Sequence, residues 1–198
     1  MNFINKIKNI LFNPNECWVE FAREKGIKET LKYLAILTLI SINVTFIVNI
    51  IILKFAPQEK ITSPLNILHN TLNLPLSFVF YLIIIVIYLL LFVGLILNSF
   101  IIYVFVKIFK GEGGFAETYK AIGYSITPYF LLGSIPIINW FTGLYVFYLQ
   151  LVGLSKLHKM SLGKAAIISF ILTNLFLYGV LFIISFFKIL LQLTDFKI

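Results

Sequence analysis

The feature that most restricts the fold of this chain is an apolar stretch at residues 74–109. It is interrupted only lightly, by residues such as Gly94, Asn98, Ser99 and Lys107, and no proline or charge lies at its middle. A helix over this stretch would be about 54 Å long, well beyond the roughly 30 Å hydrocarbon core of a bilayer. Two spanning helices would leave no residues for a turn between them. We therefore predict one long, tilted helix that crosses at about 74–106 and projects past the membrane.

The composition is that of a membrane protein. Hydrophobic residues make up 60% of the 198 and charged residues 12%, whereas soluble domains average about 45–50% apolar and about 25% charged residues. Because lipid offers no partners for backbone polar groups, such a chain crosses the bilayer as helices. We predict an all-α, polytopic membrane protein in which a cytosolic N-terminal region (1–29) precedes a membrane domain (30–198).

Further apolar runs bring the predicted number of transmembrane helices to five. These spans lie at 31–53, 119–136, 140–156 and 165–187. The polar segment 55–73 is predicted to be an exposed loop. The sequence IPIIN at 135–139 fits the corner of a helical hairpin, but each arm has only about 16 apolar residues, near the lower limit for crossing. Residues 119–157 therefore form either two short spans or a re-entrant pair.

The N-terminal region begins with a short amphipathic helix at residues 2–12. Lys6 and Lys8 lie on one side of it, and the other side consists of Phe3, Ile4, Ile7, Ile10 and Leu11. The apolar stripe either lies in the membrane surface, with the lysines meeting anionic lipid, or packs on the protein's own membrane domain.

A second surface helix is predicted at 13–26. Asn13 can cap it, Pro14 suits its first turn and Gly26 is placed to end it. Its apolar face consists of Cys17, Trp18 and Phe21. Tryptophan favours the boundary between lipid and water, so we expect Trp18 to lie there.

Basic residues predict the orientation of the chain. Most of the 16 lysines and arginines lie in residues 1–32, 107–120 and 156–164, and the others are Lys54, Lys60, Lys188 and Lys197. Since positively charged segments remain in the cytosol, five spans place the N-terminus inside and the C-terminus outside. The net charge of +8 then needs no nucleic acid to explain it. We predict a multi-pass protein of the cell membrane.

The glycine-rich sequence KGEGGF at 110–115 is predicted to be a turn between helices. Phosphate-binding loops need a preceding strand, whereas a membrane helix precedes this segment. Its glycines, Gly111, Gly113 and Gly114, instead allow positive backbone angles and close approach. Beyond the turn, an apolar face lies opposite Glu117 and Lys120 and predicts a third amphipathic surface segment; this face consists of Phe115, Tyr119 and Ile122.

Pro128 is predicted to kink the helix that follows the turn. A proline there frees the carbonyl of Tyr124, which the hydroxyl of Ser125 or Thr127 can bond instead. The kinked segment is either a hinge or cavity wall, or a fixed structural kink.

These segments carry motifs in a fixed order: KGEGGF at 110–115, Gly123-Tyr124, Pro128, and GLSKLHK at 153–159. Together they resemble the YIP family, the Ypt/Rab-interacting membrane proteins and their prokaryotic relatives. The resemblance implies a five-span domain with a cytosolic N-terminus. The interaction or hinge residues it nominates are Gly111, Gly113, Gly114, Phe115, Gly123, Tyr124, Pro128, Lys156, His158 and Lys159.

Eukaryotic relatives of this kind are tied to vesicle trafficking and small GTPases, but that role is not carried over. The acidic Asp-Leu-Tyr-Gly-Pro type of stretch that they bear before the first span is missing here. Arg23 is the one arginine among 16 basic residues, and the chain is rich in Ile and Asn. This usage indicates an AT-rich prokaryotic genome, so we predict a prokaryotic-type member.

Catalytic chemistry is not predicted. The spans lack paired catalytic groups such as two aspartates, Ser with His, or a His-Glu-x-x-His motif. Cys17 is the single cysteine, and His69 and His158 lie far apart without companion ligands. We therefore predict no catalytic, cofactor-binding or metal-binding residues.

Two functions remain. The first is a non-enzymatic membrane protein that organises or shapes the bilayer or scaffolds partner proteins. Its expected partners are anionic headgroups on the cytosolic side and a protein partner or a second copy. The alternative is a transporter, channel or lipid-moving protein for an uncharged or lipid substrate. Its polar path would use the amides in the spans, which are Asn43, Asn49, Asn98, Gln150 and Asn174. We expect these amides to bond from helix to helix.

Overall fold

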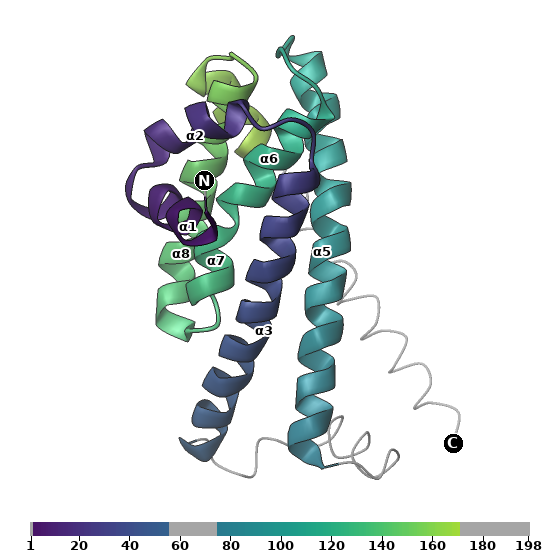
Figure 1. Ribbon diagram of the computed structural model, residues 1–198, viewed down its shortest axis with the longest axis vertical. Helices are drawn as coiled ribbons and strands as arrows, with labels where there is room; N and C mark the ends of the chain where they lie inside the picture. The colour runs from purple at the N-terminus through teal and green to yellow at the C-terminus, as the bar shows by residue number, and fades with distance from the viewer. Residues whose placement is uncertain (1, 56–74, 171–198) are drawn as a thin grey trace, which may run out of the picture.

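The computed structural model describes residues 2–55 and 75–170, in which all regular structure is helical. The helices are α1 (Phe3–Phe12), α2 (Pro14–Ala22), α3 (Lys28–Phe55), α5 (Leu76–Ile108), α6 (Phe115–Ser125), α7 (Thr127–Leu132) and α8 (Pro136–Leu157). A further helix begins at residue 162 and reaches the end of the described part at 170. Figure 1 shows α3 and α5 side by side as the two longest elements.

The predicted long helix at 74–109 is confirmed. α5 is continuous over 33 residues and carries Lys107 in its last turn. The positive charge of Lys107 stabilises the negative end of the helix dipole there. Among the described residues, three helices are long and apolar enough to cross a membrane: Lys28–Ile51, Tyr81–Ile108 and Ile137–Leu157. The five-span count stays a prediction, because the loop at 55–73 and the span at 165–187 lie largely outside the described residues.

The predicted arm at 119–136 is not one continuous helix. The chain bends at Ile126, between α6 and α7, because Pro128 has no amide proton to give to the carbonyl of Tyr124. The hydroxyl of Thr127 donates to that carbonyl over 2.7 Å. This confirms the prediction that a nearby hydroxyl bonds the carbonyl in place of the missing amide. The corner before α8 lies at residues 133–135, so most of the predicted IPIIN corner already belongs to α8. We call α6, α7 and α8 together the hairpin.

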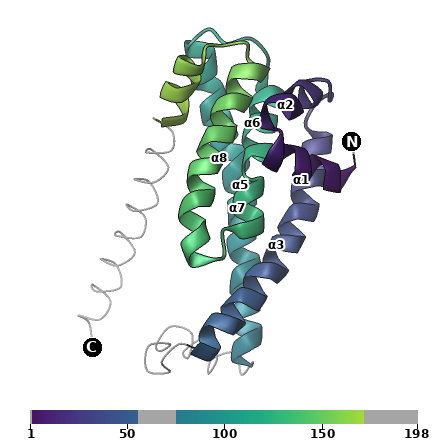
Figure 2. The ribbon, with the colours of Figure 1, turned by 90° about the vertical axis from the view of Figure 1, so that its left-hand side faces the viewer.

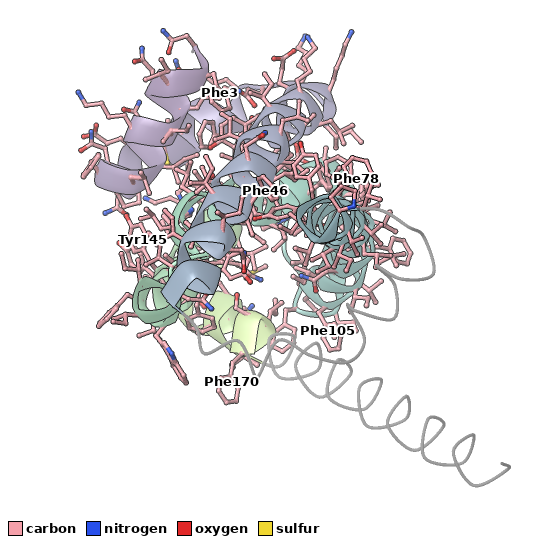
Figure 3. All side chains as sticks on the ribbon, turned by 90° about the horizontal axis from the view of Figure 1, so that it is seen from below. Phe3, Phe46, Phe78, Phe105, Tyr145 and Phe170 are labelled. Atoms are coloured by element: carbon pink, nitrogen blue, oxygen red, sulfur yellow. The ribbon has the colours of Figure 1, made fainter. Side chains whose placement is uncertain are left out.

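Helices α1 and α2, which we call the N-terminal layer, pack on the hairpin (Figure 2). The side of α1 that turns inward carries Phe3, Ile7 and the fully buried Ile10, together with Lys6. The stripe therefore packs on the protein itself, the second of the two alternatives for this helix. In the view from below, Phe3 of this layer and Phe78 of α5 lie on opposite sides of α3 (Figure 3).

Two sequence predictions for this region are wrong. Trp18 does not lie at a lipid boundary: it is fully buried, and a Cβ added at Gly153 of α8 would come 2.8 Å from its ring. The segment after the glycines is not a surface helix either, because every residue of α6 from Thr118 to Ser125 is buried. Neighbouring helices provide partners for its polar face, so that face needs no water.

The amides of α3 also differ from the expectation. Asn43 donates to the carbonyl of Leu39 and Asn49 to that of Thr45, each over 2.8 Å within the same helix. Neither bond joins two helices.

We expect Asn43→Leu to change the free energy of unfolding in detergent by less than about 1 kcal/mol, since an exposed self-bonded amide loses no helix partner. Thermal unfolding of the purified protein measures this. A loss comparable to that of a core truncation would show that Asn43 has a partner across the membrane.

Candidate functional site

The N-terminal layer is joined to the hairpin by a buried ionic ring. Lys6 Nζ lies 2.5 Å from Glu24 Oε1 and 3.0 Å from the hydroxyl of Tyr124, which in turn donates to Glu24 Oε2 over 2.6 Å. The Lys6 and Glu24 side chains are only 7% and 16% exposed. Each member of the ring satisfies the other two, so a charged pair is retained in an otherwise apolar contact.

Aromatic rings surround this ionic ring. Phe21 of α2 stacks on Tyr124 with ring centroids 4.0 Å apart, and Tyr33 of α3 lies 5.1 Å from Tyr124. The ammonium of Lys6 sits 5.1 Å from the centroid of Tyr124, within the range of a cation–π contact. Tyr124 is therefore the point where α1, α2, α3 and α6 meet.

Lys120 extends the network toward the glycine-rich turn. Its side chain is fully buried, donates to the carbonyl of Glu24 over 2.5 Å and lies 3.7 Å from the carboxylate of Glu117. Burial opposes ionisation of Glu117, but the Gly114 amide, at 2.8 Å, and Lys120 outweigh it and lower the pKa of this carboxyl. Glu117 thus remains charged opposite Lys120.

A second cluster joins the turn at 109–114, which we call the glycine turn, to the end of α8. The Glu112 amide donates to the carbonyl of His158 over 2.9 Å, and His158 Nδ1 bonds the carbonyl of Glu112. On the other side of the ring, Nε2 lies 3.0 Å from the hydroxyl of Thr118. Because a carbonyl can only accept, Nδ1 carries the proton, and in the neutral ring Nε2 accepts from Thr118. This arrangement fits a neutral imidazole.

The glycines of the turn are needed at two positions. Gly113 has φ +80°, and a Cβ there would lie 3.2 Å from His158 Nδ1. At Gly111 a Cβ would come 2.7 Å from the Val106 side chain and 3.2 Å from the Val106 carbonyl. The predicted positive angle is confirmed at Gly113 and the predicted close approach at Gly111, whereas Gly114 has an extended backbone with φ −114°.

The His158 contact predicts a pH dependence. Burial lowers the pKa of His158, so protonation is harder in the folded protein than in the unfolded chain. Neutral His158 therefore contributes its full stabilisation above about pH 6.5, the pKa of histidine in the unfolded chain. This contribution is lost as the pH falls below that value. We expect thermal stability to decline from pH 7 to pH 5 in the native protein, by about 1.4 kcal/mol for each pKa unit of difference. In His158→Gln this part of the decline should be absent; equal slopes would contradict the assignment.

The predicted site residues lie in four places in the structure. The glycine turn and its contacts bring together Gly111, Gly113, Gly114, Phe115, His158 and Lys159, with Lys159 paired to Glu112 over 2.7 Å. Gly123 and Tyr124 lie in the buried part of α6, where a Cβ at Gly123 would meet Thr30 at 2.8 Å. Pro128 belongs to α7, and Lys156 faces another surface of α8.

Sequence reasoning missed Lys6, Glu24 and Lys120 as parts of a site. For Lys6 a signal was present: it lies three residues after Phe3 and four before Ile10, the spacing of the buried side of α1. For Glu24 and Lys120 no local pattern marks the contact, since the two residues are 96 positions apart.

Lys156 stands at the edge of a groove between α2, α8 and the helix at 162–170. The groove has a volume of about 640 Å³ and is lined by Asn15, Tyr148, Leu151, Val152, Ser155, Lys156, Leu162, Gly163 and Ala166. Its walls are mainly apolar, and Lys156 is the charged member of this lining. Within the described residues no group of three or more His, Cys, Asp or Glu side chains is arranged to hold a metal ion.

The family model of the Yip1 domain matches residues 8–185. The chain belongs to the Yip1 domain family. A search of the curated proteins and of the solved structures found no match. The Yip1 domain match includes the glycine turn, Lys120, Tyr124 and His158, whereas Lys6 lies just before it. Together with the apolar helices, this membership identifies a multi-pass membrane protein and confirms the family resemblance of the sequence motifs.

Proposed function

We propose that this Yip1-domain protein organises or shapes the bilayer, or scaffolds partners on it, without catalysing a reaction. The observation that supports this role is a concentration of exposed lysines around the glycine turn and the end of α8. We call it the basic end, and it consists of Lys107, Lys110, Lys156, Lys159 and Lys164. The exposed carboxylate of Glu112 lies among these lysines and pairs with Lys159. Each lysine near an anionic surface contributes about 1 kcal/mol of attraction.

The direct test compares the lipid around the protein before and after removing two of these charges. Lys110→Gln with Lys156→Gln should lower the enrichment of anionic phospholipid in nanodiscs of mixed phosphatidylglycerol and phosphatidylcholine, by roughly fivefold per lysine. The matched control is Lys25→Gln with Lys28→Gln, two exposed lysines where α2 leads into α3. If both pairs lower the enrichment equally, the basic end has no special role.

Shaping of the membrane also needs apolar side chains that can enter it. Ile4 and Phe12 of α1 are each 73% exposed, whereas Ile10 is fully buried. We expect Ile4→Glu with Phe12→Glu to reduce tubulation or clustering of liposomes while leaving thermal stability nearly unchanged. Ile10→Glu should instead unfold the layer. If the native protein leaves the shape of the liposomes unchanged, the proposal that it shapes membranes is wrong.

Transport of an uncharged or lipid substrate is the alternative function. The groove beside Lys156 favours this alternative, because the apolar walls of the groove and its single charged side chain suit one lipid molecule. The same proteoliposomes distinguish the two functions: passage of a solute or movement of labelled lipid between leaflets, without a change of vesicle shape, would favour transport.

A further inference from the structure

The depth of the hairpin can be measured against α3 by using α1 as a marker. At one end of α1, Phe3 packs on Tyr33 of α3 with ring centroids 5.3 Å apart. At its other end, the carbonyl of Leu11 accepts a bond from Tyr145 of α8 over 2.8 Å. Figure 2 shows α1 running across the long axis of the bundle. Tyr33 and Tyr145 therefore lie at similar depths.

From this common level the two helices extend by very different lengths. α3 continues from Tyr33 to Phe55, about 33 Å at 1.5 Å per residue, whereas α8 extends from Tyr145 back to Pro136, only about 14 Å. Figures 1 and 2 agree, because the α7–α8 corner lies well short of the far ends of α3 and α5.

Contacts of α7 give a second, independent depth marker. The carbonyl of Phe130 accepts a bond from Ser41, halfway along α3, and the Phe130 ring lies 5.5 Å from that of Tyr88. Beyond Tyr88, α5 continues to Leu76 for about 18 Å. The corner of the hairpin is thus level with the middle of α3 and of α5.

Polar groups fix where the hydrocarbon begins. Lys8 and Asn5 are exposed on α1, at the level of Tyr145. A lysine held there inside the hydrocarbon would be costly, so the headgroup region reaches at least to this level. The part of α8 nearer the corner has a mainly apolar exposed face, which carries Ile137 (78%), Trp140 (81%), Phe141 (69%) and Leu144 (71%) beside the amide of Asn139.

We propose that the hairpin is re-entrant: it enters the membrane from the basic end and turns back near the bilayer midplane. Its exposed apolar face contacts acyl chains of one leaflet, and among the described helices only α3 and α5 continue into the other. A re-entrant pair returns to the side it came from, as two full spans would, so the orientation predicted from the lysines is unaffected.

The re-entrant hairpin offers a reason why the protein would shape the membrane. That reason rests on the proposed membrane-shaping role, whereas the depth of the hairpin does not. Near the basic end the cross-section contains the N-terminal layer and the hairpin in addition to α3 and α5. Near the opposite end only α3 and α5 remain among the residues described. A protein with a larger cross-section in one leaflet favours bending in which that leaflet lies on the convex side of the membrane.

Trp140 is a natural probe of this depth. The chain has two tryptophans, and Trp18 is buried in the protein, so the difference between native protein and Trp140→Phe reports Trp140 alone. In liposomes of brominated phosphatidylcholine, we expect the strongest quenching by bromines at the middle of the acyl chain, because Trp140 lies about 8 Å along α8 from the level of Tyr145, and weaker quenching by bromines near the carbonyl. Two full spans would place Trp140 at the far interface, and stronger quenching by the shallow bromines would overturn the proposal.

Thiol labelling provides a second measurement. Cys17 can remain in place, because burial raises the pKa of its thiol to about 12 and leaves little thiolate to react. Ser134→Cys, at the corner, should resist a membrane-impermeant maleimide added to either side of sealed proteoliposomes, whereas Lys110→Cys should be labelled from the basic end. Labelling of Ser134→Cys from the opposite side would overturn the proposal. Vesicles that keep their shape while Trp140 remains deep would contradict only the membrane-shaping role.

Discussion

Replacing Glu24 with alanine is expected to release the N-terminal layer from the hairpin. The change leaves the ammonium of Lys6 buried without its carboxylate and removes the acceptor of the Tyr124 hydroxyl. Removal of one partner from a buried ion pair typically costs about 3–5 kcal/mol, because the other charge remains desolvated. Thermal unfolding in detergent should show this loss. Cys17, buried in α2, should also become reactive to maleimide as the layer lifts.

The control for this prediction is a carboxylate of the same region in an exposed pair. Glu29 lies 3.2 Å from Lys32, with side chains 51% and 60% exposed, and such surface pairs contribute about 0–1 kcal/mol. Glu29→Ala should therefore be nearly neutral. Lys6→Met combined with Glu24→Gln removes both charges and should recover part of the loss. If Glu24→Ala behaves like Glu29→Ala, the ionic ring does not hold the layer.

The second large effect is expected at Gly153. A Cβ there would lie 2.8 Å from two ring atoms of Trp18, and a buried indole has no flexible end that can move aside. Gly153→Ala should destabilise the protein by about 1–3 kcal/mol through overpacking. It should also displace α2, which the labelling of Cys17 reports.

Gly143, on the same helix, is the matched control. A Cβ at this position meets nothing within 4 Å, so Gly143→Ala should only remove the flexibility of glycine and stabilise α8 by about 0.5–1 kcal/mol. Opposite signs for the two substitutions would establish the contact between α2 and α8. Equal effects would show that helix propensity alone is being measured.

Parts of the candidate site could be read from local sequence. The glycines at 111 and 113, the proline at 128 and the hydroxyl of Thr127 act on the backbone within a few residues, where φ and hydrogen-bond geometry are set locally. For this reason their roles were predictable. His158 was nominated by the family resemblance, but its bonds to Glu112 and Thr118 depend on how α8 meets α6, which no local pattern gives.

The sequence by itself determined that the chain is a helical membrane protein with one very long helix, because apolar length and the need to satisfy backbone groups in lipid leave no other solution. Only the tertiary structure decided the burial of Trp18, Lys6 and Lys120. An amphipathic side chain suits a lipid boundary and a protein interior equally well until its neighbours are known. The neighbours here are Gly153, Glu24 and Tyr124, each distant in sequence and brought close by packing of the helices.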